Sequence, residues 1–155
     1  MNSIDENYIQ YVASEKKIGE LHHRIATLIG ISDSVMWTLH CLCDEDTIHT
    51  QNSIAMKMGV PKQTINSAVN WLIKQGYIYM EQLPIARNNK QILLTEQGKA
   101  FCKKYIAPVV KAEEVAFDRL SKEEQETYLS LGIKHNQFQL EEFQALLTQL
   151  RGESE

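Results

Sequence analysis

Apolar residues recur every three or four positions over most of the chain, and this spacing predicts helices rather than strands. Four helices are expected in the first half, over residues 3–29, 33–43, 50–58 and 61–75, and a bend or break of the first near Ser14 is left open. They are bounded by residue types common at helix ends: the predicted caps are Ser32 or Asp33 and Thr50, and the predicted stops are Gly30, Gly59 and Gly76. The fourth helix begins at Pro61, which suits a first helical turn.

The period changes after Gly76. The stretches YIYMEQL and KQILLT have the composition of strands, and the turn residues between them predict a β-hairpin with its tip at residues 84–89. Helical spacing then resumes in a helix that Thr95 caps and that Pro108 bends or interrupts. SKEE at residues 121–124 is a capping box that opens a last helix, in which Gly132 is the weak point. The expected fold is therefore mainly α-helical with one small β-hairpin.

Two short helices joined through Gly59 and followed by a hairpin have the element order of a winged helix-turn-helix. Ala55 would let these two helices cross closely, and Gly59 permits a tight turn. The buried stripe of the second helix is expected to contain Ile65, Ala68, Val69, Leu72 and Ile73. Another kind of compact helical hairpin would also place small residues at its corner, and the following β-hairpin weighs against that alternative.

Charge adds a second observation. The chain has 155 residues, of which 43% are apolar, so one domain with a hydrophobic core is expected. Its net charge is −4, yet residues 51–104 contain eight basic and two acidic residues and carry +6, while the remainder carries −10. A basic centre between acidic flanks suits a protein that places one face against a polyanion, although a chance run of solvated lysines would look the same.

The stretches SIAMKMGVPKQTINSAVNWLIKQGYI and ILLTEQGKAF, together with the hairpin, resemble the MarR family of bacterial transcription regulators. Members commonly show a leucine-threonine-glutamate-x-glycine stretch after the wing. The motif resemblance covers about residues 50–101, and the element order matches over almost the whole chain. The resemblance implies a homodimer, a recognition helix in each major groove of double-stranded DNA and a wing in the flanking minor groove. It also implies repression that a small-molecule effector, an oxidant or a metal relieves.

In this view the whole chain, residues 1–155, is one unit of the family. Residues 33–98 form the winged helix-turn-helix, and residues 1–30 and 99–150 form the helical dimerisation part. Apolar side chains at helical spacing near both ends independently favour a partner subunit, with packing inside one chain as the alternative. These side chains are Tyr8, Tyr11, Val12, Phe138, Phe143, Leu146, Leu147 and Leu150.

The face of the fourth helix opposite its apolar stripe is polar and contains no acid. It offers Lys62, Gln63, Thr64, Asn66, Ser67 and Asn70. Asparagine and glutamine can pair with adenine, serine and threonine can contact base or phosphate, and lysine suits phosphate. An ordinary solvated face is the alternative. In the wing, Arg87 and Lys90 are the cations, and an arginine there can enter a narrow minor groove.

Two positions depart from the family pattern. Ala86 stands where members often have an aspartate that pairs with the wing arginine, which leaves open whether Arg87 or Asn88 matches that arginine. Pro61 stands where many relatives have a serine that caps the recognition helix. Since proline offers no side-chain cap, one amide at the start of this helix needs another partner.

No cofactor, metal site or catalytic residue is predicted. No nucleophile and base can be paired. The spacings of the weighed metal ligands match no compact metal motif; these are Glu20, His22, His23, His40, Cys41 and Cys43. Cys41, Cys43 and Cys102 are expected to be free thiols, and the sequence leaves open whether one responds to oxidants. Trp37, His40 and Tyr105 could line an aromatic ligand pocket, although core packing explains them as well.

The functional expectation is a dimeric, sequence-specific DNA-binding regulator that represses at an inverted-repeat operator until a signal releases it. The alternative is a winged-helix protein-interaction module that does not bind DNA. No apolar run approaches the roughly 20 residues of a membrane span, and the first residues lack the features of an export signal. We therefore expect a cytoplasmic protein with no membrane partner.

Overall fold

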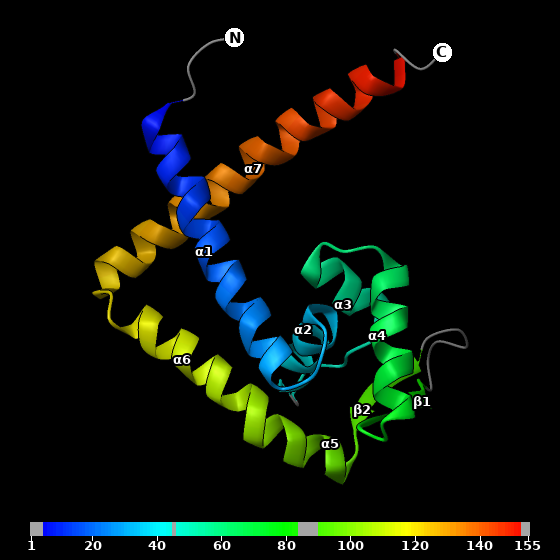
Figure 1. The fold of residues 1–155 in the computed structure, drawn as a ribbon. Coiled ribbons are helices and arrows are strands. Elements are labelled where there is room, and N and C mark those ends of the chain that lie inside the picture. Colours follow the sequence, from blue (N-terminus) through cyan, green and yellow to red (C-terminus); the bar gives the residue numbers. More distant parts are fainter. Residues whose placement is uncertain (1–4, 45, 84–89, 153–155) are drawn as a thin grey trace. The chain divides into compact units, whose positions relative to one another are not determined.

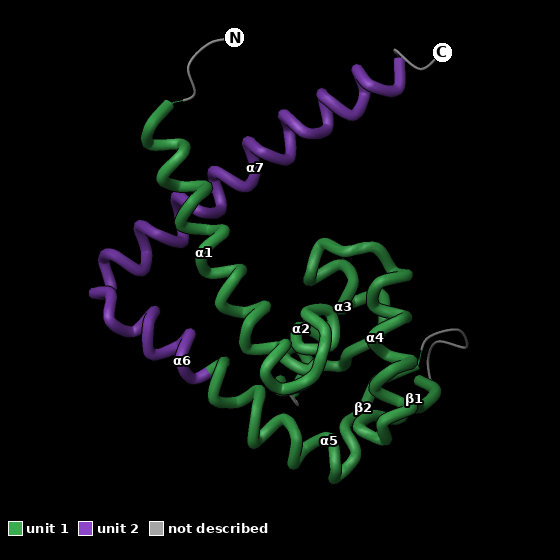
Figure 2. Tube along the Cα trace, viewed as in Figure 1, with its two compact units in different colours: residues 1–110 green, residues 111–155 purple. Residues whose placement is uncertain are grey.

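The computed structural model describes residues 5–44, 46–83 and 90–152, and Figure 1 shows its fold. The elements are α1 (Glu6–Leu28), α2 (Asp33–Leu42), α3 (Gln51–Met58), α4 (Lys62–Lys74), β1 (Ile78–Gln82), β2 (Lys90–Leu94), α5 (Glu96–Phe101), the π-helix η1 (Cys102–Ile106), α6 (Ala107–Asp118) and α7 (Lys122–Gly152). The predicted class, mainly helical with a two-stranded antiparallel hairpin, is confirmed. The chain divides into two compact units, residues 1–110 and 111–155, whose boundary falls within α6 (Figure 2).

The helix ends follow the predicted capping chemistry. Asp5 caps α1, since its carboxylate accepts hydrogen bonds from the backbone amides of Asn7 and Tyr8 at 2.8 and 3.3 Å. α1 continues unbroken from Glu6 and ends before Gly30. Gly30 has a φ of +78°, a left-handed conformation that glycine adopts without steric cost. Of the two candidates for the next cap, Ser32 is the residue that caps α2.

The hydrophobic core of the first unit lies among α2, α3, α4, the hairpin and η1, with Ala26 of α1 added to it. Its most deeply buried side chains are Met36, Leu39, Ile54, Ile65, Leu72, Ile92 and Ile106. β1 and β2 pair antiparallel, with Ile78 opposite Leu94 and Gln82 opposite Lys90. The predicted hairpin tip, residues 84–89, lies outside the described residues.

The junction between hairpin and α5 explains the Thr-Glu-x-Gly stretch. The Thr95 hydroxyl donates to the carbonyl oxygen of Gly76 at 2.6 Å and accepts from the amide of Gly98 at 3.0 Å. Thr95 is thus the cap that the sequence predicts, and it also ties the end of α4 to the start of α5. Gly98 is buried, and a Cβ at this position would collide with the carbonyl group of Tyr77.

The interruption predicted near Pro108 lies in the preceding turn. There the helix widens into η1, and the amide of Ala107 bonds to the carbonyl of Cys102, five residues back. A proline has no amide to donate, and its ring crowds the carbonyl four residues earlier. A wider turn before Pro108 relieves that crowding while the helix continues as α6.

The second unit consists of the end of α6 and the long helix α7. The predicted capping box is present: the Glu124 amide donates to the Ser121 hydroxyl at 3.2 Å, and the Ser121 amide donates to the Glu124 carboxylate at 2.7 Å. Buried Gln125 completes the corner by donating to the carbonyl oxygens of Phe117 and Leu120. α7 runs through Gly132 without a break, so the predicted weak point does not interrupt it.

Within the described residues, no single helix has both the length and the apolar character needed to cross a membrane. Joined as a pair, α1 and α2 pass the same test of length and composition, with a bend of 91° between them. Helices that form a hydrophobic core pass this test as well, so the pair does not identify a membrane span.

Candidate nucleic-acid interface

α3 is a short helix with a well-formed cap, and it packs against α4. Thr50 and Ser53 form a reciprocal cap in which each backbone amide donates to the other residue's hydroxyl, at 2.8 and 3.1 Å. The helix stops at Gly59, whose φ is +62°, as predicted. Ile54 and Ala55 are buried against α4, so the angle between the two helices is fixed by side-chain packing.

α4 begins one residue later than predicted, because Pro61 occupies the N-cap position and Lys62 is the first helical residue. Pro61 makes no side-chain capping bond, and its carbonyl accepts from the amide of Thr64 at 2.9 Å. An N-terminus without a side-chain cap presents backbone N–H groups and the positive end of the helix dipole. Such an end favours an anion, for instance a phosphate group.

The buried stripe of α4 consists of Ile65, Ala68, Val69 and Leu72. The prediction that Ile73 is a fifth buried member is wrong, because its side chain is 42% exposed. Ile73 follows Leu72 by one residue, and a step of about 100° around the helix turns it away from the core.

The predicted polar residues of α4 divide into two groups. Lys62, Gln63, Ser67 and Asn70 are exposed. Thr64 and Asn66 are half-buried, because they lie at the two borders of the apolar stripe. The fully exposed polar face is therefore narrower than predicted, and no acidic side chain lies anywhere in α4.

Two polar side chains of α4 have partners within the protein. The Asn66 side-chain oxygen accepts from the side-chain amide of Gln51 at 3.4 Å, which links the start of α3 to α4. The Ser67 hydroxyl donates to the carbonyl of Gln63 at 3.0 Å. Gln51 was not among the predicted residues, since only the packing of α3 on α4 brings it close. Exposed Lys74 continues the face of Ser67 and Asn70 by one more turn, a continuation visible in the sequence spacing.

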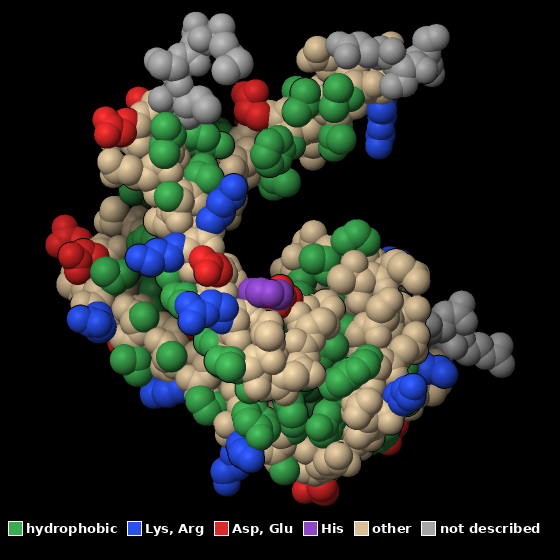
Figure 3. Space-filling view, viewed as in Figure 1, with side chains coloured by type: hydrophobic (Ala, Val, Ile, Leu, Met, Phe, Trp, Pro, Cys, Tyr) green, Lys and Arg blue, Asp and Glu red, His purple; other side chains and the backbone are tan. Residues whose placement is uncertain are grey.

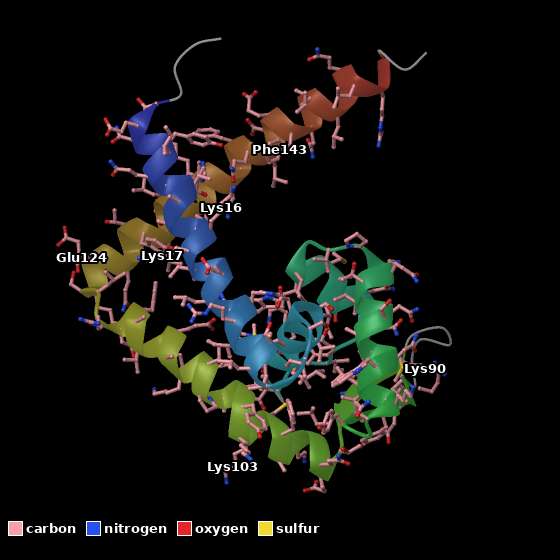
Figure 4. The ribbon with its side chains drawn as sticks, in the orientation of Figure 1. Lys16, Lys17, Lys90, Lys103, Glu124 and Phe143 are labelled. Carbon is pink, nitrogen blue, oxygen red and sulfur yellow. The ribbon has the colours of Figure 1, made fainter. Side chains whose placement is uncertain are left out.

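In the wing, Lys90 is exposed at the start of β2, opposite Gln82 (Figure 4). Arg87, the other predicted cation, lies outside the described residues. The hairpin is held to the helix-turn-helix by a backbone bond from the amide of Ile92 to the carbonyl of His49, at 2.8 Å. Lys90 therefore stands on the same packed scaffold as α4.

The residues considered for sensing are used in local packing. Trp37 contacts the rings of His22 and His40, with centroids 4.9 and 5.4 Å apart, and Tyr105 packs against Phe101 at 4.9 Å. His23 lies 3.0 Å from the Asp33 carboxylate. Among the residues that the structure describes, no three metal-ligating side chains gather in one place.

Cys41, Cys43 and Cys102 form no disulfide, in agreement with the thiols expected from the sequence. Cys41 and Cys102 are buried, and Cys43 is half-buried. Burial raises the pKa of the Cys41 thiol, and nearby Lys57 only partly opposes that shift. A raised pKa keeps Cys41 protonated and a poor nucleophile.

The arrangement of α3, α4 and the hairpin defines a winged helix-turn-helix protein. Residues 29–84 match the model of the MarR family, which spans the supporting helix, α4 and the first wing strand. The matched segment is that of a MarR family winged helix-turn-helix transcription regulator, as its motifs predict. That family consists of regulators rather than enzymes.

Solved structures show the same fold over most of the chain. A MarR family regulator from Neisseria meningitidis matches with a TM-score of 0.70 at 20% identity, over 89% of this chain and 96% of that one. MepR of Staphylococcus aureus, in a complex with DNA, matches with a TM-score of 0.65 at 20% identity, over 87% and 98%. A MarR regulator from Methanosarcina mazei matches with a TM-score of 0.62 at 19% identity, over 88% and 99%. Comparison with curated proteins gives no match.

Proposed function

We propose that this regulator binds DNA in a sequence-specific manner and that α4 is the helix that enters the major groove. The observation that carries the proposal is the exposed face of α4, which is polar, free of acids and fixed by a buried stripe on its other side. Amide side chains on such a face can pair with base edges, and a rigid helix holds them in register.

Charge supports the same surface. Lys62, Lys74 and Lys90 are exposed on the described part of the basic segment, and the N-terminus of α4 lacks a side-chain cap. Lysines and free backbone amides bind phosphates without distinguishing sequences, so they supply affinity and salt dependence.

Each predicted residue has a proposed role. Gln63 and Asn70 contact bases, Lys62 and Ser67 contact the phosphate backbone, and Asn66 contacts DNA in the orientation that Gln51 favours. Thr64, at the border of the exposed face, is placed to contact phosphate. In the wing, Lys90 and Arg87 lie along the flanking minor groove, where groove width is the recognised feature.

MepR, similar in fold to this chain, is described as a transcription regulator of a multidrug efflux pump, and its structure was determined with DNA. This likeness supports the use of the shared fold for DNA binding. By the pattern of the family we assign repression to this protein, with release by a signal that acts on the dimer. An operator beside its own gene is the first place to look.

We also propose that the protein acts as a homodimer through residues 1–30 and 99–150. On α7, Phe143, Leu146, Leu147 and Leu150 form an exposed apolar stripe at helical spacing; Figure 3 shows apolar side chains along this helix, and Figure 4 labels Phe143. On α1, Tyr8 and Tyr11 are exposed as well, and Val12 is half-buried. On α7, Phe138 is also exposed, at 52%. Exposed apolar surface of this extent is typical of a subunit interface.

A two-fold dimer would present two α4 helices about 34 Å apart, which suits an inverted repeat.

The alternative is a winged-helix module that binds a protein rather than DNA. To separate the two, the affinity for duplexes from upstream of its own gene is measured at several salt concentrations. We expect affinity to fall steeply with salt, and Lys62→Ala to reduce the log-log slope by about 1. Lys111→Ala, which removes an exposed lysine on α6, is the control and should leave the slope unchanged. Absence of salt-dependent binding to every duplex would favour the protein-interaction module.

A further inference from the structure

A cavity of about 180 Å³ opens on the first unit between the segment that joins α2 to α3, the hairpin and α5. Its apolar wall includes Leu42 and Ile92, and its polar groups include Asp44, Thr47 and His49. Among the residues that the structure describes, none of those predicted to contact DNA lines this cavity. The cavity therefore needs an explanation separate from that of α4.

His49 gives the cavity a hydrogen-bond acceptor. Its side chain is buried, with 5% exposure, and Nε2 lies 2.9 Å from the carbonyl oxygen of Asp44. A carbonyl oxygen only accepts, so Nε2 carries a proton, and in this tautomer of the imidazole Nδ1 is an acceptor. In the described part of the chain, every buried side-chain nitrogen or oxygen has a partner, and no bond to Nδ1 is present. We infer that Nδ1 reaches solvent, through the cavity that His49 lines.

Asp44 gives the cavity a negative charge. The Thr47 hydroxyl donates to the Asp44 carboxylate at 2.7 Å, and this bond is the main cause that lowers the pKa of Asp44. The carboxylate therefore stays ionised at neutral pH and can accept further hydrogen bonds. The cation in the lining, Lys99, lies 3.5 Å from the Glu96 carboxylate, which offsets its charge.

We propose that this cavity binds a small organic cation, such as an amine or amidine, whose N–H groups donate to the Asp44 carboxylate and to His49 Nδ1. The apolar part of the ligand would pack on Leu42 and Ile92. The volume is well above the roughly 10–15 Å³ that one water needs and below the roughly 300 Å³ typical for drug-sized ligands, so the ligand is small. An anion is disfavoured by Asp44. This inference does not depend on DNA binding.

The test uses benzamidine, a flat amidine, added to the full-length protein while backbone amide resonances are followed by NMR. We expect shifts confined to the cavity, at Asp44, Thr47, His49 and Ile92. Asp44→Asn should weaken binding by about tenfold, because it replaces a charge-assisted hydrogen bond with a neutral one. Asp46→Asn is the matched control: it removes an exposed carboxylate of the same segment outside the cavity lining, and it should have a much smaller effect.

A second variant tests the histidine. His49→Gln keeps a donor for the Asp44 carbonyl and replaces the rigid ring acceptor Nδ1 with an amide oxygen on a flexible side chain, and a thermal melt establishes that it folds. We expect weaker benzamidine binding here too, and no shifts in the cavity from benzoate, which has similar size and opposite charge. The proposal is overturned if benzoate binds equally well, if the shifts lie elsewhere, or if Asp44→Asn leaves benzamidine affinity unchanged.

Discussion

Asn70 is the exposed amide in the middle of the acid-free face of α4, one helical turn from Ser67. If it pairs with a base, Asn70→Ala should lose about 1–3 kcal/mol of discrimination between the preferred base pair and its substitutes. Affinity for unrelated duplexes should change little, since phosphate contacts supply that part. The measurement is a competition assay with duplexes that differ at single positions.

Gln97→Ala is the matched control for Asn70→Ala, because it removes an exposed amide in the same unit but on α5. It should leave base preference intact. Equal loss of discrimination in both variants, or none in Asn70→Ala, would contradict the role given to Asn70.

Gly98 is a position where adding a single side chain should change the stability of the fold. A Cβ there would collide with the carbonyl group of Tyr77 and lie 3.2 Å from a methyl of Leu94. We expect Gly98→Ala to lower the free energy of unfolding by about 4 kcal/mol, the upper end of single substitutions. Gly132→Ala is the opposite case: nothing lies within 4 Å of its added Cβ, so α7 should gain about 0.5–1 kcal/mol. Chemical denaturation of both variants checks the pair, and an unaltered Gly98→Ala would refute the collision.

The sequence predicted the buried positions of α4 well and its borders less well. Ile65, Ala68, Val69 and Leu72 follow from helical spacing alone. Ile73 was placed inside because it is apolar, although its angle around the helix turns it to solvent. Gln51 could not be found at all, because its contact with Asn66 depends on how α3 crosses α4.

The start of α7 carries a pH-dependent cap. The pKa of Glu124 is lowered, chiefly by the hydrogen bond from the Ser121 amide and next by the Ser121 hydroxyl. A folded-state pKa below the unfolded one gives stabilisation that is complete above the unfolded pKa and is lost as the pH falls through the folded pKa. We expect NMR titration to place the Glu124 carboxyl (Figure 4) below an ordinary glutamate, and Ser121→Ala to move it partly back. A Glu124 midpoint at or above that of an ordinary glutamate would contradict the cap.

Helices were predictable where local chemistry defines their ends. Thr50, Thr95 and Ser121 cap the predicted helices, and Gly59 stops one of them. The sequence could not predict that the helix widens into η1, since a helix can accommodate a proline by a bend, a break or a π-turn. Which of these forms depends on the packing of the residues before it, here buried Cys102 and Ile106.

The apolar stripe of α7 makes dimerisation testable. Leu147 is 54% exposed, so Leu147→Asp should leave the fold of one subunit intact and shift sedimentation from dimer toward monomer. Thr148→Asp adds the same charge on the neighbouring, polar side of α7 and serves as the control. If Leu147→Asp sediments as the wild type does, the stripe is not the interface.

Function was predictable from the sequence as far as the family. The helix-turn-helix motif and the Thr-Glu-x-Gly stretch carry that assignment, because both encode backbone geometry. The bases that α4 prefers do not follow from the same residues, since Gln63 and Asn70 can each accept and donate. The cavity at His49 was also hidden, because three separate segments of the chain build it.

Selection of bound duplexes from a random pool tests DNA recognition most directly. The proposed dimer, with its two α4 helices, predicts enrichment of an inverted repeat whose half-sites lie about one helical turn apart. Enrichment should weaken for Asn70→Ala and persist for Gln97→Ala. Recovery of no common sequence by the wild-type protein would contradict the proposal that α4 recognises an operator.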